Sequence, residues 1–153
     1  MALHTDTEIY KATYDLCKLV TELVANMPRN FKADFGAELR RRCMALVMRT
    51  YEANTSEDKA PILLRMRGEV EAVNLALRLA VDLKLISRPQ YARAIAMAAN
   101  IGKQATGWQR HSERALVAVP SRQPGQRAME SGRTAGPQAH RQEHQGYRQP
   151  RPQ

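Results

Sequence analysis

The sequence predicts an all-α fold, an antiparallel up-down-up-down four-helix bundle with a disordered basic C-terminal tail. Three observations predict it. Four consecutive segments carry apolar residues at helical spacing, and a capping residue or a proline bounds each of them. Aromatic residues are only 5% of the chain although 43% of it is hydrophobic, which suits helices better than strands. The connections are short, so neighbouring helices should be antiparallel.

The first two helices are predicted over residues 6–27 and 30–54. Thr5 and Glu8 have the spacing of a capping box, and Pro28 ends the first helix. The apolar face of this helix consists of Ile9, Leu16, Val20, Leu23, Val24 and Met27. The second helix has one apolar stripe (Phe35, Leu39, Cys43, Leu46 and Thr50) and another on its far side (Met44, Val47, Met48 and Tyr51).

The third and fourth helices are predicted over residues 58–86 and 87–110. Pro61 falls in the first turn of the third helix, and Ser87 with Gln90 has capping spacing at the start of the fourth. One face of the third helix holds Ile62, Met66, Val70, Val73, Leu77 and Val81, and a second holds Leu64, Leu75, Leu79, Leu83 and Ile86. The fourth buries Tyr91, Ile95, Ala98, Ile101, Ala105 and Trp108, and its Gly102 allows a neighbouring helix to come close.

The second apolar faces of the middle helices predict self-association or a permanent protein partner. Leaving such a face in water would forgo roughly 1.5–3 kcal/mol per large side chain, and sizeable exposed apolar patches mark interfaces. The alternative is a monomer in which the third helix occupies a central position and buries both of its faces.

The composition changes near residue 115, so we expect a bundle domain over 1–114 and a disordered tail over 115–153. The tail is rich in Pro, Gly, Gln and Arg and has few large apolar residues to offset the entropy of ordering. It contains His140, Glu143 and His144 in an H-x-x-E-H pattern. That zinc motif requires a helix, which this composition does not favour, so a metal-dependent enzyme is the least supported hypothesis.

Catalytic and membrane signatures are missing from the sequence. No apolar stretch approaches the roughly 20 residues of a membrane span, and the N-terminus does not read as a secretory signal. Cys17 and Cys43 lie on apolar faces and read as small core residues, which suits a reducing cytoplasm. No histidine falls within the bundle, and acidic residues mostly stand three or four places from a base, as in Glu38/Arg42, Arg65/Glu69 or Arg67/Glu71. We therefore expect no enzyme, no cofactor and no metal.

The strongest functional signal is charge, because 24 Lys and Arg against 15 Asp and Glu give a net charge of +9. Such an excess attracts polyanions, and nucleic acid is the commonest of them. With few aromatic side chains for base stacking, contacts should be mainly to phosphates. The candidate contact residues for nucleic acid or a polymerase are Lys18, Arg40, Arg41, Arg42, Arg49, Arg67, Arg78 and Arg93.

Three segments carry a resemblance to a known family: MPRNFKADFGAELRRR at 27–42, LRLAVDLKLIS at 77–87 and IGKQATGWQR at 101–110. The chain resembles, over roughly residues 8–110, the short four-helix bundle proteins related to the intervening-sequence protein of 23S rRNA genes. Within that group it resembles the accessory variability determinant, Avd, of diversity-generating retroelements. The tail is not part of the resemblance.

The resemblance implies a basic, non-catalytic accessory protein that forms a pentameric barrel of four-helix bundles. Such a protein associates with the retroelement's reverse transcriptase and binds RNA or DNA to support synthesis of mutagenised cDNA. By position, Arg78 is the best-matched basic residue for contact with the polymerase or its RNA, and the other candidates are assigned from charge alone. The alternative is a structural or protein-interaction bundle of the intervening-sequence type without a nucleic-acid role.

Overall fold

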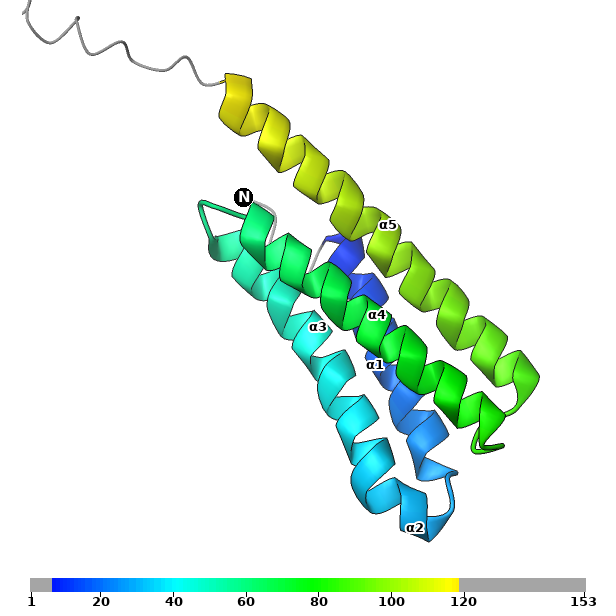
Figure 1. Cartoon of the computed structure of the whole chain (residues 1–153). Coiled ribbons are helices and arrows are strands. Elements are labelled where there is room, and N and C mark those ends of the chain that lie inside the picture. The colour runs from blue at the N-terminus through cyan, green and yellow to red at the C-terminus, as the bar shows by residue number, and fades with distance from the viewer. Residues whose placement is uncertain (1–6, 119–153) are drawn as a thin grey trace, which may run out of the picture. The chain divides into compact units, whose positions relative to one another are not determined.

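The computed structural model describes residues 7–118, which form helices joined by short connections (Figure 1). The elements are α1 (Glu8–Ala25), α2 (Arg29–Phe31), the π-helix η2 (Lys32–Gly36), α3 (Ala37–Thr55), α4 (Ala60–Asp82) and α5 (Arg88–Ala118). Because α2, η2 and α3 follow one another without a break, they form one rod. The described residues thus make a four-helix bundle without strands, and the predicted fold class is confirmed.

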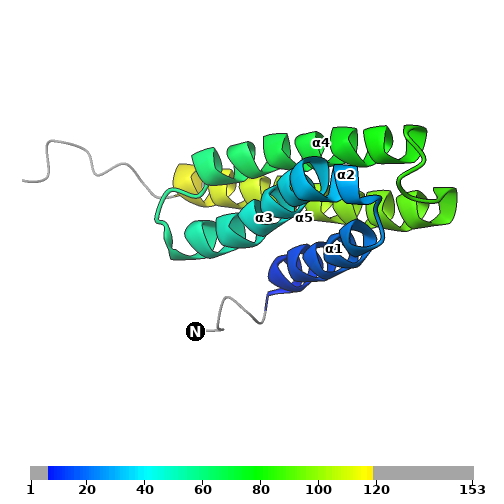
Figure 2. The same ribbon diagram turned by 90° about the horizontal axis from the view of Figure 1, so that it is seen from below.

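Each rod lies at a corner of the bundle and contacts two others (Figure 2). α1 packs against α3 and α5, and α4 also packs against α3 and α5. Within residues 7–118, no Cα atom of α1 lies within 8 Å of a Cα atom of α4, so these two helices are diagonal to each other. The third predicted helix, α4, is therefore not central, so the monomer does not bury its second apolar face.

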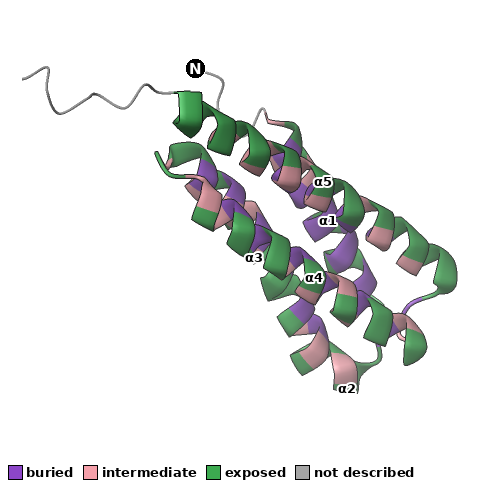
Figure 3. Ribbon diagram, turned by 45° about the horizontal axis from the view of Figure 1, so that its top comes forward, coloured by how far each residue is buried: buried purple, intermediate pink, exposed green. Residues whose placement is uncertain are grey.

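The core lies between the four rods and is almost entirely aliphatic (Figure 3). Its fully enclosed large side chains include Leu16, Val20, Leu39, Leu46, Leu63, Met66, Val70, Val73, Leu77 and Ile101. Thr13 and Thr50 are buried too, and their hydroxyls donate to the carbonyl oxygens of Tyr10 and Val47, at 2.9 and 2.6 Å. These bonds remove the cost of burying a hydroxyl group.

The start of α1 corrects the predicted cap. Thr7, and not Thr5, is the N-cap, because its Oγ1 accepts the backbone N–H of Tyr10 at 3.3 Å. Glu8 is then the first residue of the helix, where its charge favours the positive end of the helix dipole. The helix ends at Ala25, shortly before Pro28.

A π-helical turn interrupts the predicted second helix where it passes closest to α1. At Gly36 an added Cβ would lie 2.6 Å from Cγ1 of Val24, which is too close for two non-bonded carbon atoms. Only glycine therefore fits at this crossing without a shift of its neighbours. The spacing of apolar residues gave no sign of this wider turn; π-helices are rare and occur mostly as single turns within α-helices.

α4 ends four residues earlier than predicted, and the difference moves Ile86 into the core. Lys84 adopts a positive φ of 58°, and the N–H groups of Lys84 and Leu85 bond to the carbonyls of Val81 and Ala80. This pattern is a Schellman C-cap, which turns the chain away from the helix axis. Ile86 consequently packs inside the bundle, 6% exposed, and does not continue the outer row of leucines.

α5 begins as predicted but extends further. The backbone N–H of Ser87 donates to Oε1 of Gln90, and the N–H of Gln90 donates to Oγ of Ser87, so the capping box is confirmed. The helix continues to Ala118, past both the predicted helix end at 110 and the predicted domain boundary at 114. Residues 115–118 are thus helical, and Ala115, Leu116 and Ala118 among them are good helix formers.

The remaining predictions for the tail, including the His140/Glu143/His144 pattern and disorder over 119–153, lie outside the described residues. Of the helices between residues 7 and 118, none combines the length and the apolar character that crossing a bilayer would require.

Candidate nucleic-acid interface

The polar face of α4 and one face of α5 border a groove of about 500 Å³, here called the α4–α5 groove. Arg67, Glu71 and Asn74 line it from α4, and Lys103 and Arg110 line it from α5. The three cations outnumber the single carboxylate. Lys103 and Arg110 are seven residues apart, two helical turns, which places both on the same side of α5.

Small residues of α5 keep the groove open to a ligand. Ala99, Gly102, Thr106 and Gly107 line it, and a Cβ added at Gly107 would meet no atom within 4 Å. Across it, Nη1 of Arg67 donates to Oε1 of Gln109 at 3.3 Å, which joins α4 to α5. Asn74 also lines the groove, and in the described structure its side-chain oxygen is buried without a hydrogen-bond partner.

A second cationic cluster lies at the turn between α4 and α5, around a pocket of about 840 Å³. Arg78, Lys84 and Arg88 line it, together with Asp82 and Tyr91. Nε of Arg78 donates to Oδ2 of Asp82 at 3.1 Å. This hydrogen bond and the charge of Asp82, with a smaller contribution from Tyr91, raise the pKa of Arg78 above its ordinary value.

The groove and the turn pocket form one cationic surface along α4 and α5. Arg67 and Arg78 are eleven residues apart on the same face of α4, about 16 Å along its axis. Its cations are Arg67, Arg78, Lys84, Arg88, Lys103 and Arg110, and its carboxylates are Glu71 and Asp82. We call these residues the α4–α5 cationic surface.

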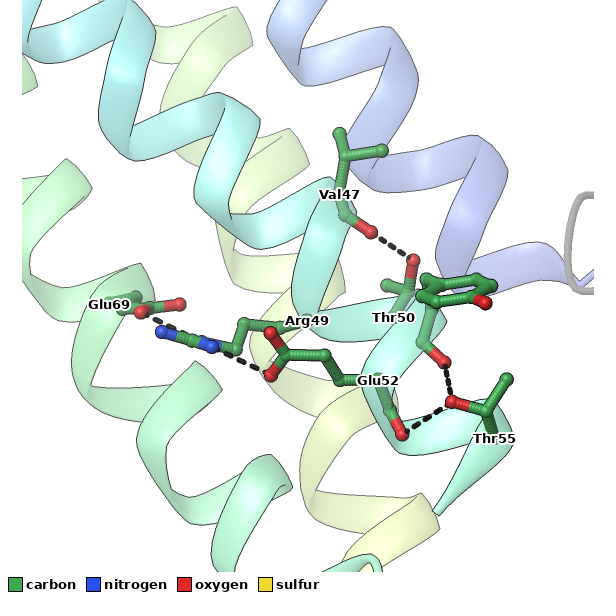
Figure 4. A network of polar contacts seen from close by, with 7 residues as sticks. Val47, Arg49, Thr50, Glu52, Thr55 and Glu69 are labelled. Atoms are coloured by element: carbon green, nitrogen blue, oxygen red, sulfur yellow. Dashed lines mark hydrogen bonds and ion pairs between the residues drawn. The ribbon is translucent and has the colours of Figure 1, made fainter.

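The candidate arginines on α3 lie on other faces of the bundle. Arg41 and Arg42 both contact Glu38, at 2.9 and 3.1 Å, so one carboxylate offsets two charges. Arg49 lies between two carboxylates, with Nη1 2.6 Å from Glu52 and Nε 3.0 Å from Glu69 of α4 (Figure 4). The bond to Glu52 is the main reason that the pKa of Arg49 is raised, since its bonds to both carboxylates outweigh partial burial. Arg49 therefore serves to join α3 to α4.

Two of the predicted ion pairs within helices are replaced by contacts between helices. Glu69 was expected to pair with Arg65 on its own helix, but it pairs with Arg49 of α3. Arg67 was expected to pair with Glu71, but its hydrogen bond is to Gln109 of α5. Spacing along one helix identifies possible partners, whereas packing of the neighbouring helix decides between them.

The other candidates are dispersed. Arg40 is exposed on α3, and its charge partly offsets the rise that burial causes in the pKa of Cys17, which places Arg40 on the α1 side. Nζ of Lys18 lies 6.0 Å from the ring centre of Tyr14 on α1. Arg93 is exposed on α5 but does not line the α4–α5 groove. Of the eight candidates, the α4–α5 cationic surface includes only Arg67 and Arg78.

Sequence reasoning missed Lys103 and Arg110. The signal that could have found them is their seven-residue spacing beside a run of alanine and glycine, which places two cations above a small-residue face. Neither residue gains significance until α4 places Arg67 opposite them.

The two cysteines are core residues, as predicted. Burial raises the pKa of the Cys43 thiol to about 12, and it also raises that of Cys17. Both therefore stay protonated at neutral pH, in a form that neither attacks electrophiles nor binds metal well. Over residues 7–118, no three His, Cys, Asp or Glu side chains come together as metal ligands.

One family model matches the chain. It is described as bAvd-like and it matches residues 8–112, almost the whole described bundle. No curated protein matches the chain. The matched region contains every residue of the α4–α5 cationic surface. The predicted Avd resemblance is confirmed: the chain belongs to the bAvd-like family.

Proposed function

We propose that this protein is a non-catalytic accessory subunit of a diversity-generating retroelement, which binds the reverse transcriptase and nucleic acid and supports mutagenic reverse transcription in the cytoplasm. The observation that carries the proposal is the α4–α5 cationic surface on a chain of the bAvd-like family. The proposed partners are the retroelement's reverse transcriptase and its template RNA or cDNA.

The cationic surface suits a phosphate backbone better than base edges. Six cations against two carboxylates attract a polyanion without selecting its sequence. Among the residues lining the two pockets of this surface, Tyr91 is the only aromatic one, so stacking of successive bases has no platform there. Affinity should accordingly fall steeply with salt and depend little on sequence.

The proposal includes self-association, with five copies as the number that the family resemblance implies. Ten large apolar side chains are exposed on the described monomer, seven of them on α1, α3 and α4 and an eighth, Leu83, at the C-cap of α4. Exposed apolar area of this extent marks interfaces. A ring of copies would repeat the cationic surface and add the phosphate contacts of each copy to those of its neighbours.

Charge reversal in the α4–α5 groove tests nucleic-acid binding. The variant Arg67→Glu/Lys103→Glu/Arg110→Glu should lose at least 30-fold in affinity for a single-stranded RNA at 50 mM salt. The control Lys11→Glu/Arg29→Glu/Lys32→Glu changes net charge equally at exposed positions of other elements, and should lose only a few-fold. Equal losses in both variants would mean that net charge, and not this surface, binds the RNA.

Binding of the polymerase needs its own experiment. The tagged protein, co-expressed with the reverse transcriptase of the same retroelement, should retain that enzyme on an affinity resin after nuclease treatment. The alternative function, a protein-interaction bundle without a nucleic-acid role, is favoured by the exposed apolar side chains alone. It predicts that the triple groove variant behaves as the unmodified protein in every assay.

A further inference from the structure

The exposed apolar side chains form two separate surfaces on different sides of the bundle. Leu64, Leu75, Leu79 and Leu83 follow the outer side of α4 and are here called the leucine stripe. The other surface lies over α1 and α3, around a groove of about 500 Å³ that we call the α1–α3 groove. The residues that line this groove come from α1 and α3 and the stripe belongs to α4, so the two surfaces share no residue.

The α1–α3 groove is concave and rich in aromatic and sulfur-containing side chains. Tyr10, Tyr14, Cys17, Met44 and Val47 line it, and the exposed Met48 and Tyr51 continue it along α3. The rings of Tyr10 and Tyr14 stack with their centres 6.1 Å apart, and Sγ of Cys17 lies 3.4 Å from Sδ of Met44. Methionine adapts to the shape of an apolar partner and tyrosine supplies rigid area, a combination typical of contact surfaces.

The leucine stripe has the complementary shape. It is a convex ridge on a single helix, about 28 Å long from Leu64 to Leu83. Leu75 is the most exposed residue of the stripe, with 72% of its surface in solvent. Gly68, between Leu64 and Leu75 in the sequence, has open space around it, since an added Cβ would meet no atom within 4 Å. A helix that presents leucines to a hydrophobic groove is a common mode of recognition.

We propose that the occupant of the α1–α3 groove is the leucine stripe of a second copy of this chain. The inference deepens the proposed function, because it rests on the self-association proposed there and names the two surfaces that meet. Since each chain has one stripe and one groove, the contact is heterologous. It repeats from copy to copy, and it gives a ring if the rotation between neighbouring copies closes.

The exposed area supports a second copy. Leu64, Leu75, Leu79, Leu83, Tyr14, Met44, Met48 and Tyr51 are each 45–72% exposed. With roughly 200 Å² per large side chain, they leave on the order of 800 Å² of apolar surface in water. A standard interface buries about 1,600 Å² in total, of which somewhat more than half is apolar. One stripe with one groove therefore supplies the apolar part of one stable interface.

Pairing of two like surfaces would cover less of this apolar area. Two stripes packed on each other would leave both grooves uncovered, and two grooves face to face would enclose empty space. Heterologous pairing covers both surfaces of every chain in a ring. It also leaves the α4–α5 groove open, because this groove lies on the α5 side of α4 and neither pairing surface includes its lining residues.

A mixing experiment tests the pairing directly. Leu75→Glu/Leu79→Glu removes the stripe, and Met44→Glu/Met48→Glu removes the groove. By light scattering coupled to size exclusion, the unmodified protein should be an oligomer, and each double variant alone should have the mass of one chain. Their equimolar mixture should have the mass of two chains, because one intact stripe and one intact groove remain. The control Leu116→Glu/Val117→Glu changes exposed residues outside both surfaces and should keep the mass of the unmodified protein.

Several outcomes would overturn the inference: an unmodified protein that is monomeric, a double variant that still associates by itself, or a mixture that stays monomeric although circular dichroism shows both variants folded. A stripe variant that keeps its assembly but no longer retains the polymerase would assign the stripe to the polymerase instead.

RNA binding, measured on the same samples, separates this inference from the proposed function. Monomeric variants should still bind RNA, about 10–100-fold more weakly because avidity is lost.

Discussion

Arg49 of α3 and Glu69 of α4 form an ion pair of 3.0 Å across two helices, and only 22% of each side chain is exposed. Arg49 also contacts Glu52, 2.6 Å away, while the second carboxylate oxygen of Glu69 is buried without a hydrogen bond among the described residues. The pair therefore fixes how α3 and α4 lie together and leaves Glu69 dependent on a single partner.

Replacing Arg49 should destabilise the bundle more than replacing any arginine at its surface. In Arg49→Ala the carboxylate of Glu69 is left partly buried and unpaired, which should lower the free energy of unfolding by about 1–3 kcal/mol. Arg41→Ala removes an exposed pair and should cost less than about 0.5 kcal/mol. Urea denaturation measures both. If the two variants unfold alike, the pair between α3 and α4 contributes nothing to stability.

Gly36→Ala should be destabilising, because the new Cβ would lie 2.6 Å from Cγ1 of the buried Val24. We expect a loss of about 1–3 kcal/mol as α1 and the π-turn move apart. Gly68→Ala is the matched control: its Cβ meets open space within α4, so the better helix propensity of alanine should stabilise by about 0.5–1 kcal/mol. Thermal melting of the two variants should show shifts of opposite sign.

The raised pKa of Cys43 predicts a loss of stability in alkali. The thiol has a pKa of about 12 in the folded chain and 9.0 in an exposed setting. The folded state therefore holds this proton more tightly than the unfolded state does. The resulting contribution to the free energy of unfolding is fully present below pH 9 and is lost as the pH rises toward 12. The slope approaches about 1.4 kcal/mol per pH unit within that range. Urea denaturation between pH 8 and pH 10.5 should show a steeper decline in the unmodified protein than in Cys43→Ala.

Salt dependence distinguishes the α4–α5 groove from the rest of the basic surface. Each groove cation that contacts a phosphate should contribute about 0.7 to the log–log slope of RNA affinity against salt. Lys103→Gln should reduce the slope by that amount, and Arg110→Gln should do the same. Arg93→Gln, on another face of α5, should leave the slope unchanged. A reduced slope for Arg93→Gln would extend the interface beyond the groove.

The termini of the helices show why boundaries were the weaker part of the sequence reasoning. The capping box of Ser87 and Gln90 is local, so its spacing predicted the start of α5 correctly. The end of α4 depends on Lys84 adopting a positive φ, which no spacing reveals because lysine has no preference for that conformation. The same turn then brings Ile86 into the core.

By itself the sequence determined the bundle, the larger part of its core and the excess of positive charge. Each follows from periodicity or composition, which are properties of a single helix or of the whole chain. The tertiary structure alone decided which charges act together. Arg49 was drawn into a contact between helices, and Arg67 was brought opposite Lys103 and Arg110. Such groupings depend on the packing of neighbouring helices, and the period of one helix carries no information about the face that the next one presents.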